Sequence, residues 1–142
     1  MRAPFGVVVA IASVLCGCAF DTQTNARRDD GMSYECDVNR PSHADITRAR
    51  RLLRDVAAAA GIPRHFGGVC SPEPLAVYMG DDVFFHAVVE HGELRIELSR
   101  SHSPPTAAFT RTKDLFDKAV AKTFGSRAVA HPPVATKIMY AY

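Results

Sequence analysis

The chain has 142 residues, of which 17 are basic and 15 acidic, and its formal net charge is +2. Because the two signs nearly balance and no run of Lys or Arg exceeds two residues, the composition excludes the strong positive field that attracts nucleic acid or acidic lipid. The length corresponds to one domain.

The first 18 residues have the pattern of an export signal. Arg2 provides a positive start, and an apolar run from Phe5 to Leu15 follows it. This run is shorter than the roughly 20 apolar residues that a membrane-spanning helix needs. A charged start, a short apolar run and small residues before a cleavage site are typical of a secretory signal peptide.

The motif Leu15-Cys16-Gly17-Cys18 resembles the lipobox of bacterial lipoproteins. The resemblance implies that residues 1–17 are a cleaved signal peptide and that Cys18 carries the lipid, including palmitate. Cys16 fits this role less well, because Leu15 would then stand at the cleavage position, where a small residue is expected. Ala19, in place of an Asp, favours the periplasmic face of the outer membrane. An ordinary secretory peptide and a retained membrane anchor are the alternatives.

The mature chain divides into a tether and a domain. Residues 18–33 are mostly polar and are predicted to form a lipidated, flexible tether, because such a segment buries too little apolar surface to fold alone. Residues 34–142 are predicted to form a single α+β periplasmic domain.

The first predicted helix has clear limits. Ser42 can cap its start, with Asp45 three residues later as a short form of the capping box. A helical stripe of apolar residues follows, and Gly61 with Pro63 ends it. The stripe comprises Ile46, Ala49, Leu52, Leu53, Val56 and Ala60.

Three strands are predicted after this helix. Leu75 to Met79 is short and apolar, whereas Val83 to Glu90 and Glu93 to Arg100 form a β-hairpin around His91-Gly92. A second helix is predicted from Thr110 to Phe124, and a fourth strand over Val134 to Tyr140. The order α-β-β-β-α-β predicts an α+β fold with a single antiparallel sheet of about four strands backed by two helices.

Two cysteines remain after the signal, Cys36 and Cys70. In an oxidising compartment such a pair is expected to form a disulfide. A metal pair or a reactive thiol is the alternative, but neither cysteine has a second Cys or a His at ligand spacing.

No set of residues predicts a catalytic or metal centre. His86 and His91 lie near Glu90 and Glu93 in the sequence, but no three or four ligands can be identified that converge. His102 and His131 are interpreted as ordinary surface residues beside prolines. Asp81 and Asp82 are interpreted as turn residues that accept backbone hydrogen bonds, and no serine lies in a Gly-x-Ser-x-Gly motif. We therefore expect no catalytic residue, metal, cofactor or small-molecule ligand.

The preferred hypothesis is a non-catalytic accessory module that is held at the membrane by its lipid and binds another envelope protein. Arg50, Arg54 and Tyr142 are the candidate contact residues. One alternative is an immunity-type inhibitor of a periplasmic toxin, in which the turn Gly80-Asp81-Asp82 would plug an active site. A second alternative is a small periplasmic hydrolase or ligand-binding enzyme.

Overall fold

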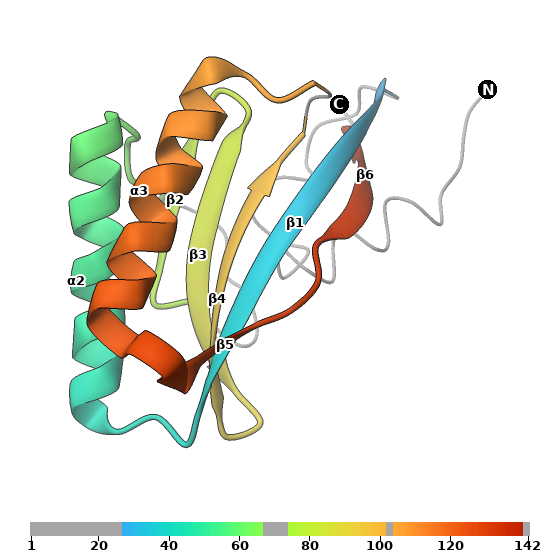
Figure 1. The fold of residues 1–142 in the computed structure, drawn as a ribbon. Coiled ribbons are helices and arrows are strands. Elements are labelled where there is room, and N and C mark those ends of the chain that lie inside the picture. The colour runs from blue at the N-terminus through green and yellow to red at the C-terminus, as the bar shows by residue number, and fades with distance from the viewer. Residues whose placement is uncertain (1–26, 67–73, 102–103, 141–142) are drawn as a thin grey trace.

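The computed structural model describes residues 27–66, 74–101 and 104–140. One antiparallel sheet carries two helices on the same face (Figure 1), so the predicted α+β class is confirmed. The elements are β1 (Arg27–Asn39), α2 (His43–Ala60), β2 (Ala76–Gly80), β3 (Val83–Glu90), β4 (Glu93–Arg100), α3 (Ala107–Phe124), the 3-10 helix η1 (Gly125–Arg127), β5 (Ala128–Ala130) and β6 (Val134–Tyr140). Within the described residues, none of the helices combines the length and the apolar character required to span a membrane.

Helix α2 begins and ends where its capping residues predict. The Ser42 side chain accepts a hydrogen bond from the Asp45 amide, and the Asp45 side chain accepts one from the Ser42 amide. This reciprocal pair satisfies two amides that the first turn would otherwise leave without partners. Gly61 then adopts φ +74°, a left-handed conformation that costs little without a Cβ, and ends the helix.

The predicted hairpin of β3 and β4 is also confirmed. Glu90 pairs with Glu93 across the turn, and Phe85 pairs with Leu98 farther along the ladder. Alternate side chains of both strands point towards the helices and form the core. Its most deeply buried large apolar side chains are Leu53, Phe85, Leu94, Ile96 and Leu98.

The sheet has six strands, in the order β2-β3-β4-β1-β5 with β6 also paired to β1, and not the predicted four. The additional long strand, β1, begins at Arg27, so its first residues fall within the stretch predicted as tether. They are held by pairing with β6, from Arg27 with Tyr140 to Ser33 with Val134. Because the two partners are about a hundred residues apart in the sequence, the composition near Arg27 gives no sign that these residues form a strand.

The other additional strand is β5. It is separate from β6 because the edge of the sheet beside β1 is interrupted. Ala130 of β5 pairs with Cys36, and Val134 of β6 pairs with Ser33. Three residues, 131–133, therefore lie opposite two residues of β1, which is a β-bulge. Pro132 and Pro133 have no amide hydrogen to donate to the ladder, which explains the break.

The predicted disulfide between Cys36 and Cys70 is not seen, and among the described residues Cys36 is the one cysteine. Cys36 is a free thiol on the helix-facing side of β1, and only 7% of its surface is exposed. Its neighbours on that face are core side chains, so the thiol packs as a small apolar group. Cys70 lies outside the described residues.

Candidate functional site

The sheet face opposite the helices carries polar side chains in cross-strand rows. His86 of β3 pairs with Glu97 of β4, and Glu97 pairs with Glu35 of β1. Two residues along each strand, and so on the same face, Arg95 of β4 pairs with Asp37 of β1. Because paired residues project to the same side of a sheet, these five side chains share one face, which we call the outer face.

At the centre of the outer face, Glu97 is buried and accepts hydrogen bonds at both carboxylate oxygens. Ser33 Oγ donates to Oε2, and His86 Nε2 lies 3.1 Å from Oε1. The side chains of His86 and Glu97 are only 3% and 2% exposed, respectively. A buried carboxylate needs such donors to offset the loss of hydration, so the trio is a closed polar network within the sheet.

This trio differs in geometry from the catalytic triad of serine hydrolases. In a triad the serine hydroxyl bonds to the imidazole, and the carboxylate orients the other side of the ring. Here the Ser33 hydroxyl and the His86 ring both bond to Glu97. The imidazole is therefore not placed to take a proton from Ser33.

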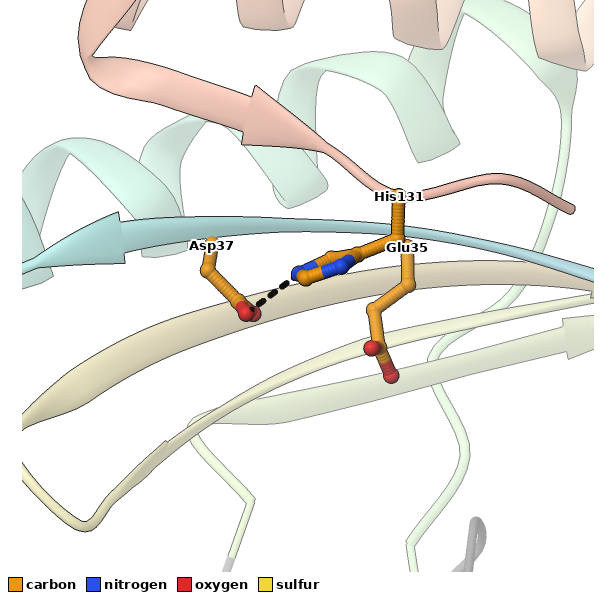
Figure 2. Close-up of side chains that lie close together, drawn as sticks. All are labelled: Glu35, Asp37 and His131. Atoms are coloured by element: carbon orange, nitrogen blue, oxygen red, sulfur yellow. Dashed lines mark hydrogen bonds and ion pairs between the residues drawn. The ribbon is translucent and has the colours of Figure 1, made fainter.

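A second cluster forms where the bulge of the edge strand crosses β1. The amide of His131 donates to the Glu35 carbonyl at 2.9 Å, which fixes the backbone of the bulge against β1. The His131 imidazole then reaches over the strand, and its Nε2 lies 2.6 Å from Asp37 Oδ2 (Figure 2). Bulges commonly redirect a side chain in this way at a sheet edge.

Glu35 completes this cluster. Glu35 and Asp37 are two residues apart on β1 and so project from the same face. Their carboxylate oxygens and a ring nitrogen of His131 all lie within 4.8 Å of one another. Two carboxylates and an imidazole are a ligand set that could hold a divalent metal ion.

Arg95 lies beside both carboxylates of the cluster. Its Nε is 3.5 Å from Glu35 Oε2 and 3.5 Å from Asp37 Oδ1, and its Nη1 is 3.7 Å from Glu90 Oε1. These separations are longer than hydrogen bonds, and neither Arg95 Nε nor Asp37 Oδ1 has a hydrogen-bond partner among the described residues. Burial raises the pKa of the Glu35 carboxyl, while the charge of Arg95 opposes the rise.

The sequence-predicted contact residues do not come together at this cluster. Arg50 and Arg54 are exposed on α2, on the opposite side of the sheet, and Arg54 pairs with Asp55 at 3.1 Å. Tyr142 lies outside the described residues, as does the proposed lipidation site Cys18.

Of the two turn aspartates considered from the sequence, Asp82 accepts backbone hydrogen bonds as interpreted, whereas Asp81 is exposed. Asp82 is buried, and its carboxylate accepts hydrogen bonds from the amides of Ser101 and Thr106. This carboxylate therefore stabilises the turn from within. His91 is exposed, 3.8 Å from Glu90.

Sequence reasoning missed His131, which it assigned to the ordinary surface. Its partner Asp37 is 94 residues away along the chain, and no spacing rule connects the two. A usable signal did exist in β1, where the apolar residues Met32, Tyr34, Cys36 and Val38 alternate with Ser33, Glu35 and Asp37. That alternation predicts a strand with one polar face.

No protein-family model matches this sequence, and a search of curated proteins finds no significant relative.

Proposed function

We propose that the chain is a lipid-anchored protein of the outer membrane that faces the periplasm and acts as a non-catalytic module binding another envelope protein. The resemblance of Leu15-Cys16-Gly17-Cys18 to a lipobox supports the anchor. The observation that carries the binding role is an exposed, largely apolar segment at the sheet edge, residues 129–135.

All seven residues of this edge segment are exposed. Val129 and Val134 are 58% and 59% exposed and, with Phe66, are the large apolar side chains most accessible to solvent among the described residues. Val129 pairs with Asp37 and Val134 with Ser33, so both valines project on the outer face. An isolated exposed valine is ordinary, whereas here two exposed valines lie on one face of the same edge segment, with the bulge that carries His131, Pro132 and Pro133 between them.

The same prolines determine how a partner would bind. A regular edge strand invites another strand to add through its amides and carbonyls. Pro132 and Pro133 lack the amide hydrogen for that ladder. We therefore expect the partner to pack against the valine and proline side chains, with polar contacts to His131 at the centre.

The position of the edge segment suits an anchored protein. Arg27, where β1 begins, follows Cys18 by nine residues, which span at most about 30 Å when extended. Asp37, which pairs with Val129, lies ten residues farther along β1, or about 33 Å at the rise of a strand. Ser33, which pairs with Val134, lies about 20 Å along β1 from Arg27. In this proposal the linker and the strand together give a periplasmic partner room to reach the edge segment.

Two experiments test the proposal. The mass of the mature N-terminus should correspond to an acylated Cys18, and an unmodified N-terminus at Ala19 would refute the anchor. A photo-cross-linking amino acid at Val129 or Val134 in intact cells should give a discrete protein adduct. The same probe at Ala58, which is exposed on α2, serves as the matched control; equal adducts from all three positions would refute a role for the edge segment.

A further inference from the structure

The cluster of Glu35, Asp37 and His131 has the features of a binding site as well as those of a surface ion pair. It joins a strand and a bulge, and the amide bond from His131 to the Glu35 carbonyl fixes the two relative to each other. Asp37 is nine-tenths buried, and its Oδ1 has no hydrogen-bond partner within the described part of the chain. The His131 side chain is 44% exposed, so solvent reaches the cluster.

From this geometry we infer that Glu35, Asp37 and His131 bind a divalent transition-metal ion, such as Zn²⁺, and that Arg95 balances the two carboxylates when the metal is absent. Carboxylate oxygens at positions i and i+2 of a strand, with one imidazole from a neighbouring segment, give three ligands and leave a coordination position open. That number of protein ligands is typical of open zinc sites.

The imidazole determines the class of metal. Ca²⁺ and Mg²⁺ prefer sites made of oxygen ligands alone. Imidazole nitrogen favours zinc and its transition-metal neighbours. The ligand atoms lie within 4.8 Å of one another, whereas ligands of a tetrahedral zinc ion are about 3.4 Å apart. The flexible Glu35 side chain can close this difference by changing its rotamer.

Arg95 lies where it would compete with a bound metal ion for the two carboxylates. Its guanidinium is close to both carboxylates, at 3.5 Å from each, and also lies 3.7 Å from Glu90. A metal ion at the cluster would repel the guanidinium, and Glu90 offers it an alternative partner on the same face. Arg95 therefore competes with the metal, so its removal should strengthen metal binding, whereas removal of a ligand should weaken it.

The test is calorimetric titration of Zn²⁺ into the full-length chain, purified in detergent without a polyhistidine tag. His131→Gln should weaken binding at least about tenfold, since even loss of an outer-shell partner costs 10- to 100-fold. Glu35→Gln and the near-isosteric Asp37→Asn should also weaken it. Arg95→Gln should tighten it.

The matched control is His91→Gln. His91 also lies beside a carboxylate, that of Glu90, but belongs to no group of three ligands among the described residues. This variant should bind Zn²⁺ as the unmodified chain does. The inference fails if the unmodified chain does not bind Zn²⁺, if His131→Gln binds it equally well, or if His91→Gln abolishes binding. Circular dichroism shows whether each variant is folded, and Glu35→Gln provides a second ligand variant should Asp37→Asn fail to fold.

Discussion

The buried carboxylate of Glu97 gives the sharpest test of how the outer face is stabilised. Replacing Glu97 with Ala removes the acceptor of both Ser33 Oγ and His86 Nε2. Each donor left buried without a partner costs about 1–3 kcal/mol. For the two donors the expected loss is therefore about 2–6 kcal/mol of unfolding free energy, a large share of the about 5–15 kcal/mol that a domain possesses.

The assay for this prediction is urea unfolding followed by circular dichroism. Glu93→Ala, a partly exposed position on the same face of β4, serves as the control and should change the stability by less than about 0.5 kcal/mol. In a double-mutant cycle, His86→Ala and Glu97→Ala should be coupled by about 0.5–3 kcal/mol. Additive effects of the two substitutions, or a Glu97→Ala variant as stable as Glu93→Ala, would refute the network.

Three further predictions concern the helix caps and the core. Ser42→Ala should reduce stability by about 1 kcal/mol in urea unfolding, because it removes the N-cap of α2; an unchanged midpoint would contradict this. The hydrogen bond from Arg127 lowers the pKa of Asp45 from its ordinary 3.8, so the stabilisation is present above pH 3.8 and is lost as the pH falls towards the lowered value. The stability difference between the unmodified chain and Asp45→Asn should accordingly shrink on acidification, and a difference that grows would contradict the assignment. Burial raises the pKa of the Cys36 thiol to about 11, so a thiol reagent should label Cys36 slowly in the native protein and fully after denaturation without reductant; rapid native labelling, or none after denaturation, would show that the thiol is not a buried free group.

Local patterns predicted the elements whose signals lie within a short stretch of sequence. The N-cap at Ser42 and the glycine at position 61 define α2 to the residue, and His91-Gly92 defines the β3–β4 turn. The start of α3 was predicted too late, at Thr110, whereas the helix begins at Ala107 with Thr106 as its N-cap. The Ala107-Ala108 pair at this start carries no apolar periodicity that could have marked it.

What the sequence did not predict depends on contacts between distant residues. The first residues of β1, from Arg27 to Gly31, form a strand because β6 pairs with them, and β6 comes much later in the chain. The three-residue β5 is too short to show alternation. The cluster at Asp37 requires the bulge at residues 131–133 to place His131, and that bulge appears only once the register of β1 against its neighbours is known.

The most direct test of the proposed binding surface compares two faces of the protein in intact cells. The adduct from a photo-cross-linker at Val134 should be lost when Val129→Lys places a charge on the edge segment. It should persist in the Arg50→Glu, Arg54→Glu double variant, which reverses charge on the exposed side of α2, across the sheet from that segment. Loss of the adduct in the α2 variant, with retention in Val129→Lys, would contradict the account and move the binding surface to the helices.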